Sequence, residues 1–375
     1  MFRPQIQKTS TLFFIALFNL VLVFLAVKSE TKVKKIGYED KIIAVEMMEQ
    51  LIFELNKNFI IEKSKLDLYN SGLIGLQNSP ITTIQDNDSL MFKSKLLTTH
   101  PNFAALIVEF FYDAEISSGD TIAVSMTGSF PGANLALLSV CETMNITPII
   151  MSSAGSSAWG ANRVDLSWPI IESYLFDNNF LRNRSIVYSM GGDNDNGDNL
   201  SDKGIEILES SIPNNVNFIN EFSLIDNISK KINFFDSNSN NYSMYVNIGG
   251  GASSLGNGLD KDSLQVGLIN FLDIQDIGFS EFKKSISYNF LTEKSIPMLN
   301  IKNIIKLVPQ DYVSDIMTGD MKVGKGSLFY KYDPYNPFVI SLCLLLSIAL
   351  IVAIGIYSHI QIKKRMETHE VDSVV

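Results

Sequence analysis

The sequence has 375 residues, with 30 Lys and Arg against 40 Asp and Glu, which gives a formal net charge of −10 at pH 7. Proteins that bind nucleic acid carry a basic patch or stripe, so this acidic balance argues against a nucleic-acid partner. Hydrophobic residues make up 46% of the chain, a composition too apolar for a disordered protein. The two cysteines, Cys141 and Cys343, are too few for a disulfide framework, which excludes a small module held together by several bridges.

The first apolar segment covers residues 11–27 and carries no charge. Its length is close to the lower limit for a membrane-spanning helix and also suits the core of a signal peptide. The exit of this segment, Leu25 to Glu30, is a poor cleavage site, so we favour an uncleaved anchor behind a cytoplasmic N-terminus of residues 1–10.

A second apolar segment covers residues 338–362 and is followed at once by Lys363, Lys364 and Arg365. It is long enough to span a membrane, and short basic flanks tend to stay in the cytoplasm. The sequence therefore predicts a two-pass protein of the cell membrane. Residues 363–375 would form a cytoplasmic tail, and residues 28–337 would lie outside.

The region after the first span begins with an amphipathic helix over residues 39–59, because apolar side chains recur at three- and four-residue spacing. This helix could pair with another chain as a stalk, but we favour packing on the domain. Residues 77–90 read as a polar loop. We therefore assign residues 28–99 as a juxtamembrane helix and loop, followed by a domain of residues 100–337.

Strands and helices alternate in that domain. The predicted strands are residues 121–126, 147–151, 185–190 and 242–248, and the predicted helices are residues 103–114, 134–144, 169–179, 203–211 and 223–235. Continuous apolar strands separated by helices indicate a mostly parallel sheet with helices on both faces. The predicted fold class is thus α/β, flanked by two transmembrane helices.

Each of the four predicted strands ends in a small, polar, glycine-rich loop. In open parallel sheets, ligands bind in a crevice beyond the carboxyl ends of the strands. Backbone N–H groups in such loops could hold an anion, and Arg163 is a candidate partner for a carboxylate. The predicted ligand-binding residues are Gly128, Ser129, Gly132, Ser153, Ser156, Arg163, Gly249, Gly250 and Gly251. For residues 128–132, a tight turn that simply starts a helix is the alternative.

No catalytic motif is complete in this sequence. The loop of residues 128–132 matches neither G-x-S-x-G nor a phosphate-binding loop. A Ser-His-Asp site in the region between the spans would have to use His100, since the other two histidines lie in or beyond the second span. Ser129, His100 and Asp193 are the weak catalytic candidates, and whether the protein is an enzyme stays open.

The acidic loop contains Asp193, Asp195 and Asp198. Its spacing fails the EF-hand pattern, because Gly204 stands where a bidentate glutamate is needed. Clustered carboxylates could still hold a divalent cation, and a solvated loop is the alternative. We expect no other cofactor.

Two stretches carry a resemblance to a known family: GDTIAVSMTGSFPGANLALLSVCETMNITPIIMSSAGSSAWGAN at residues 119–162, and SMGGDNDNGDN at residues 189–199. With the N-terminal anchor, they resemble the poly-gamma-glutamate system protein family, over residues 40–330. These are membrane-anchored proteins associated with bacterial poly-gamma-glutamate synthesis and export. The resemblance implies a cell-envelope role in capsule biosynthesis beside the polymer's synthase, and it transfers no catalytic residues.

Three functions follow as hypotheses. The first is an accessory membrane protein that binds the anionic polymer or the poly-gamma-glutamate synthase components. The second is an extracytoplasmic hydrolase of gamma-glutamyl or related amide bonds, and the third is a sensing module. The lack of a recognisable nucleophile and base favours the first or the third, and we expect the first. The expected partners are the membrane, the synthase components and the polymer, with no nucleic acid.

Overall fold

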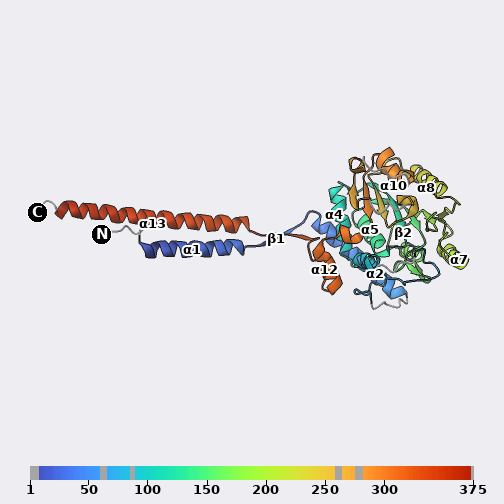
Figure 1. The fold of residues 1–375 in the computed structure, drawn as a ribbon, viewed down its shortest axis with the longest axis horizontal. Coiled ribbons are helices and arrows are strands. Elements are labelled where there is room, and N and C mark those ends of the chain that lie inside the picture. The colour runs from blue at the N-terminus through green and yellow to red at the C-terminus, as the bar shows by residue number, and fades with distance from the viewer. Residues whose placement is uncertain (1–7, 60–65, 85–88, 258–263, 275–281, 373–375) are drawn as a thin grey trace. The chain divides into compact units, whose positions relative to one another are not determined.

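The computed structural model describes residues 8–59, 66–84, 89–257, 264–274 and 282–372 (Figure 1). The chain divides into two compact units. One unit is Lys35–Phe329, and the other joins Met1–Lys34 to Tyr330–Val375. Each unit has its own internal contacts and is described by itself.

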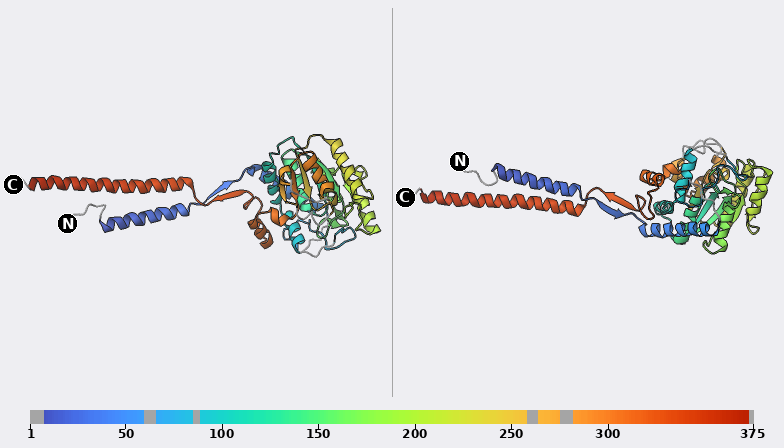
Figure 2. Two further views of the ribbon diagram at one scale, coloured as in Figure 1. Left: turned by 45° about the horizontal axis from the view of Figure 1, so that its top comes forward. Right: turned by 90° about the horizontal axis from the view of Figure 1, so that it is seen from below.

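The terminal unit is a pair of long helices with a short ribbon. Helices α1 (Thr9–Val27) and α13 (Pro337–Asp372) lie side by side (Figure 2). The Ser347 hydroxyl donates to Asn19 Oδ1 between them. Strands β1 (Thr31–Lys34) and β11 (Tyr330–Asp333) pair antiparallel.

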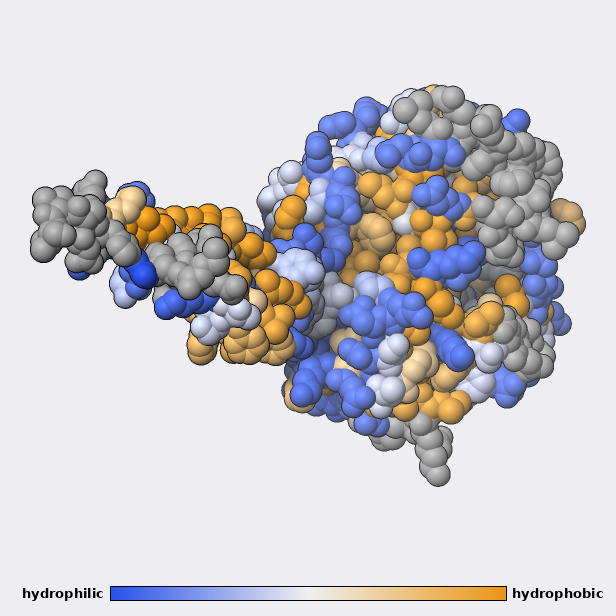
Figure 3. Space-filling model, turned by 60° about the vertical axis from the view of Figure 1, so that its left-hand side comes forward, coloured by the Kyte–Doolittle hydropathy of each residue, from blue (hydrophilic) through white to orange (hydrophobic). Residues whose placement is uncertain are grey.

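Both terminal helices are long and apolar enough to cross a membrane, over Thr9–Val27 and Pro337–Glu367. Hydrophobic side chains cover much of the surface that they present in Figure 3. A long helix whose apolar side chains face outward is stable where lipid replaces water, so this unit supports association with a membrane.

The unit Lys35–Phe329 is built around a seven-stranded sheet with the order β7-β6-β3-β2-β8-β10-β9. The pairs are parallel except that β9 runs antiparallel to β10. This confirms the predicted mostly parallel α/β fold. The strands are β2 (Thr121–Thr127), β3 (Thr147–Ser153), β6 (Val187–Ser189), β7 (Asn217–Phe218), β8 (Met244–Ile248), β9 (Gly267–Ile269) and β10 (Met298–Ile301), and a separate hairpin joins β4 (Asn162–Arg163) to β5 (Leu166–Ser167).

Helices cover both faces of this sheet. Helices α2, α4 and α5 pack together on one face, and α8, α9 and α10 pack on the other. The helices are α2 (Tyr38–Asn58), α3 (Ser89–Thr99), α4 (Phe103–Asp113), α5 (Pro131–Thr143), α6 (Trp168–Asp177), α7 (Asp202–Ser211), α8 (Leu224–Asn238), α9 (Ala252–Leu255), α10 (Ile286–Tyr288), α11 (Ile304–Leu307) and α12 (Gln310–Thr318), with helical turns at Phe271–Ile274, Phe282–Lys284 and Asn289–Glu293.

Helix α2 belongs to the core of this unit. Its apolar stripe, including Met48 and Leu51, is fully buried against α4 and α5. Lys41 on the same helix is also buried, and its Nζ donates to Glu109 Oε2 at 2.6 Å and to the Leu328 carbonyl at 2.8 Å. The amphipathic pattern of residues 39–59 thus reflects packing on the domain, and the compact unit begins at Lys35 instead of at residue 100.

The face of the sheet under α8 changes from apolar to polar toward the carboxyl ends of its strands. Met151 and Val187 pair in register and belong to the hydrophobic core. Two residues further along, Ser153 lies opposite Ser189 in β6 and opposite Thr127 in β2. Because side chains alternate between faces, these three hydroxyl groups lie on the same face as that core. They bring polar groups to the edge of the sheet where ligands bind in this fold class.

Candidate functional site

A cleft of about 590 Å³ lies at the carboxyl ends of the central strands. Strand β2 has β3 on one side and β8 on the other, so the strand order reverses between β2 and β8. This reversal is where doubly wound sheets leave a crevice for ligands. The loops after β2, β3, β6, β8 and β10 all reach the cleft, together with part of α3. Its volume falls within the range of small-molecule sites.

The structure brings several of the predicted site residues to this one cleft: Ser129, Ser153, Asp193, Asp195, Gly250 and Gly251 all line it. They come from four loops that are far apart in the sequence. The expectation that the strand-end loops converge is thus matched by the geometry of these six residues.

Gly128 and Gly132 lie beside the cleft without lining it, and both are positions of close packing. A Cβ at Gly132 would lie 2.4 Å from the Thr98 carbonyl oxygen, so the glycine lets α5 approach α3. A Cβ at Gly128 would lie 3.0 Å from the Ala154 carbonyl oxygen. Pro131 occupies the first turn of α5, where its fixed φ favours the start of a helix. The alternative prediction, a tight turn that starts a helix, describes these two glycines.

Ser156 and Arg163 are two further predicted residues that the structure does not bring to the cleft. The Ser156 hydroxyl is buried and donates to the Ser157 carbonyl oxygen at 2.9 Å. Arg163 lies on β4, where its Nη2 atom is 3.2 Å from Asp165 Oδ2. The guanidinium therefore pairs with a neighbour in its own hairpin.

In the loop after β8, one glycine is required by the backbone conformation and close packing, and two glycines line the cleft. Gly249 has φ +93°, and a Cβ there would lie 2.4 Å from Thr127 Oγ1. Gly250 and Gly251 line the cleft, and their N–H groups meet no acceptor among the described residues. Below the loop, Asn247 Nδ2 donates to the Gly249 carbonyl at 2.8 Å and so fixes its path.

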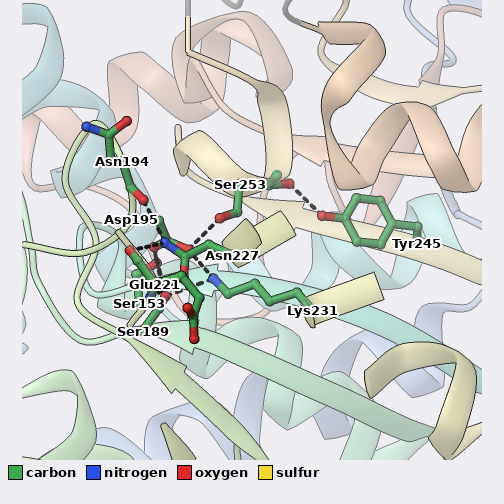
Figure 4. A network of polar contacts seen from close by, with 10 residues as sticks. Ser153, Ser189, Asn194, Asp195, Glu221, Asn227, Lys231, Tyr245 and Ser253 are labelled. Atoms are coloured by element: carbon green, nitrogen blue, oxygen red, sulfur yellow. Dashed lines mark hydrogen bonds and ion pairs between the residues drawn. The ribbon is translucent and has the colours of Figure 1, made fainter. Parts of the chain in front are cut away.

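A buried ion pair includes Asp195, one of the residues that line the cleft (Figure 4). Asp195 and Lys231 form it, with side chains only 2% and 5% exposed. Asp195 Oδ1 accepts hydrogen bonds from Ser189 at 2.7 Å and from Ser153 at 3.1 Å, and Oδ2 accepts one from Ser253. Lys231 Nζ also donates to Ser189 Oγ at 2.8 Å. Asp195 is therefore satisfied by an ammonium and three hydroxyl groups.

Helix α8 carries Lys231 on its inner stripe. The Ser223 side chain caps the helix by accepting from the Asp226 N–H at 3.2 Å. Ile228, Lys231 and Phe235 then follow at three- and four-residue spacing and are all buried. The sequence shows this lysine in the middle of an apolar stripe. Because a buried charge needs a partner, that pattern could have predicted a buried ion pair.

The acidic loop does not form the predicted metal site. Asp195 points inward to Lys231, while Asp198 Oδ1 accepts from the Asp193 N–H at 3.0 Å. Asp193 is exposed at the cleft. No group of three His, Cys, Asp or Glu side chains suited to a metal ion is present in the part of the chain that the structure describes. The alternative, a solvated loop, is wrong for Asp195, which is 1% exposed.

Left-handed backbone at several positions allows the loop to fold back in this way. Gly191, Gly192 and Gly197 have φ between +82° and +86°, and Asp195 has φ +59°. Glycine adopts this region freely, and aspartate is among the few other residues that tolerate it. These left-handed positions let the loop direct Asp195 into the core.

His100 does not take part in a catalytic site at the cleft. It is 2% exposed, its Nδ1 accepts from the Asn102 N–H at 3.1 Å, and its ring packs edge-on against Tyr69. Burial lowers the pKa of His100 to about 4. It is not among the residues that line the cleft, so it forms no pair with Ser129, Ser153 or Asp193 there.

Several residues that line the cleft carry hydrogen-bond donors, and Ser157, Lys302 and Lys306 among them were not predicted from the sequence. Ser157 Oγ accepts from Lys95 Nζ at 2.7 Å, and Ser129 Oγ accepts from the Ser157 N–H at 3.0 Å. Each hydroxyl oxygen already accepts a hydrogen bond, so its proton is available for a ligand. Lys302 and Lys306, which follow β10, add two ammonium groups to the lining. In the sequence, the apolar run of β10 is followed directly by Lys302. This pattern could have identified a further strand that ends at the cleft with a lysine.

No protein-family model matches this chain, and no curated protein or solved structure shows significant similarity to it. The fold and the cleft define a doubly wound α/β protein with a cleft at its switch point. Two long apolar helices accompany this domain in the same chain.

Proposed function

We propose that this protein is a membrane-anchored accessory component of a system that makes or exports an anionic envelope polymer, and that its α/β domain binds that polymer through the cleft. Poly-gamma-glutamate is the polymer that the sequence resemblance suggests. The carrying observation is the set of donors that line the cleft, Ser129, Ser157, Lys302 and Lys306, in a chain with a net charge of −10.

The charge distribution supports a carboxylate-bearing ligand. An acidic protein repels a polyanion at long range, so binding requires a local concentration of positive charge and N–H or O–H donors. Charge-assisted hydrogen bonds from lysine to a carboxylate are stronger than neutral ones. Hydroxyl groups with their oxygens already used as acceptors favour the same ligand, since they have a proton to give. The cleft combines both kinds of donor.

The two apolar helices support the cellular setting of the proposal. A domain tethered to the membrane stays close to polymer that emerges from a membrane-bound synthase. Tethering raises the effective concentration of the domain at the polymer, so a weak contact between the cleft and the polymer suffices. We therefore propose that the domain lies outside the cytoplasmic membrane, beside the synthase components.

Calorimetry on the full-length chain in lipid nanodiscs tests this proposal. We expect heat of binding from poly-gamma-glutamate and none from a neutral polymer of the same length. The variant Lys302→Gln/Lys306→Gln should weaken binding of the anionic polymer by about tenfold, which corresponds to about 1.4 kcal/mol.

The matched control is Lys322→Gln/Lys325→Gln, which removes the same charge from two exposed lysines outside the cleft lining. It should bind as the parent protein does. Equal heats for the two polymers, or equal losses in the two double variants, would contradict the proposed function.

A further inference from the structure

The lining of the cleft also contains hydrogen-bond acceptors. Ser153 donates its hydroxyl proton to Asp195 Oδ1 at 3.1 Å, which leaves its oxygen lone pairs to accept. Asp193 is exposed and lines the cleft, and its carboxylate forms no hydrogen bond or ion pair with the described residues. A ligand that complements the cleft must therefore match a negative group as well as positive ones.

Asp193 is held in place by its backbone. Its N–H donates to Asp198 Oδ1 at 3.0 Å, and its carbonyl oxygen accepts from Asn257 Nδ2 at 3.0 Å. Two residues later, Asp195 is locked to Lys231 in the buried ion pair. Because the backbone on both sides of Asp193 is fixed, the loop needs little reordering when a ligand binds, which lowers the cost of recognition.

We infer that the cleft recognises a ligand with both a carboxylate and a free ammonium group, so that it takes the amino-terminal end of a gamma-glutamyl chain or a free amino acid, and not an internal segment. This inference rests on the proposed function and specifies which part of the polymer enters the site. The carboxylate lies at Ser129, Ser157, Lys302 and Lys306, and the ammonium pairs with Asp193.

Asp193 makes this choice by attraction and repulsion together. An internal gamma-glutamyl unit offers only amide groups and carboxylates, so it would place like charges at Asp193 or cover that carboxylate with a neutral group. Like-charge contacts and unpaired, desolvated carboxylates both oppose binding. A terminal ammonium satisfies the carboxylate, and specificity arises from the difference between the two cases.

Calorimetry with two synthetic gamma-linked glutamate tetramers tests the inference on the full-length chain in nanodiscs. One tetramer has a free amino terminus, and the other is acetylated there, which removes the ammonium and leaves the carboxylates of the chain in place. We expect acetylation to weaken binding by about tenfold. In Asp193→Asn the two tetramers should bind alike, because the group that distinguishes them is gone.

The control Asp320→Asn removes the same charge from an exposed aspartate outside the cleft lining and should preserve the tenfold preference. Asp193 makes no side-chain hydrogen bond with the described residues, so its replacement leaves folding intact. Equal binding of both tetramers by the parent protein overturns this inference and leaves the proposed function standing. Absence of binding by either tetramer and by the polymer overturns both.

Discussion

The Lys231 ammonium forms an ion pair with the Asp195 carboxylate, and both side chains are almost fully buried. The pair joins helix α8 to the loop that follows β6 (Figure 4). Asn227 on the same helix strengthens this link by donating to the Asn194 carbonyl at 2.9 Å. The loop that carries Asp193 is therefore anchored to the domain core through Asn194 and Asp195.

Replacing Lys231 alone should destabilise the protein strongly. Lys231→Met leaves the Asp195 carboxylate buried without its cation, and breaking a buried pair from one side costs about 3–5 kcal/mol. The double variant Lys231→Met/Asp195→Leu should recover much of that loss, since no uncompensated charge remains. Urea unfolding of the detergent-solubilised chain, followed by tryptophan fluorescence, measures the difference.

The neighbouring residue supplies the control for that experiment. Lys230 pairs with Glu221, and its side chain is 53% exposed. Lys230→Met should cost about 0–1 kcal/mol, as is usual for a surface ion pair. Similar losses at the two lysines would show that the buried pair contributes nothing special to stability.

The two adjacent glycines after β8 should respond differently to substitution. Gly249→Ala forces a side chain into a left-handed position and against Thr127, so we expect a loss of stability of about 1–3 kcal/mol. At Gly250 the nearest atom to an added Cβ is Lys302 Cε at 3.8 Å. Gly250→Ala should leave the unfolding midpoint unchanged and weaken polymer binding by narrowing the cleft. A stable Gly249→Ala protein would contradict the packing argument.

His100 should make the protein lose stability in mild acid. Its pKa is lowered by burial from 6.5 to about 4, so the folded state binds fewer protons than the unfolded state between these values. The contribution is complete above pH 6.5 and is lost as the pH falls toward 4, by up to about 3 kcal/mol.

The variant His100→Asn keeps an acceptor for the Asn102 N–H and removes the titrating ring. Unfolding midpoints of parent and variant, measured from pH 7 to pH 4, should therefore converge as the pH falls. Parallel curves would show that His100 does not titrate differently in the folded and unfolded states.

The two terminal helices predict a simple topology. Because α1 and α13 each cross the membrane once in this scheme, both termini lie on one side and residues 28–337 on the other. By the positive-inside rule, the basic cluster at Lys363, Lys364 and Arg365 predicts that the termini lie in the cytoplasm. Reporter fusions after Asn199 and at the C-terminus should give opposite signals, and a cytoplasmic signal from the fusion after Asn199 would contradict the scheme.

Hydrophobic periodicity located most elements of the core. The apolar runs at β2, β3 and β8 and the helices between them were identified within a few residues of their bounds. The short strands β7, β9 and β10 were missed, because two to four residues are too few to show a period. The failure to predict β10 mattered most, because Lys302 and Lys306 follow this strand and supply the positive charge of the cleft.

The candidate site was located by its loops, and of its charged residues Asp193 and Asp195 were found but Lys302 and Lys306 were not. Ser129, Ser153 and Gly250 were found because glycine and serine cluster at the ends of the predicted strands. The position of a residue at the end of a strand can be read from the order of residues along the chain. Arg163 was misplaced, because a nearby charge in the sequence says nothing about the direction of its side chain. Its partner Asp165 lies two residues away in the same hairpin.

The sequence by itself determined the alternation of strands and helices and the two apolar segments, because burial in a sheet, a helix or a lipid layer each imposes its own pattern on neighbouring residues. Only the tertiary structure decided which polar groups meet. The strand order placed β8 beside β2, and the left-handed backbone at Asp195 turned that residue toward Lys231. A buried charge is stable only with a partner, and the partners of Asp195 come from three other segments of the chain, which no local pattern records.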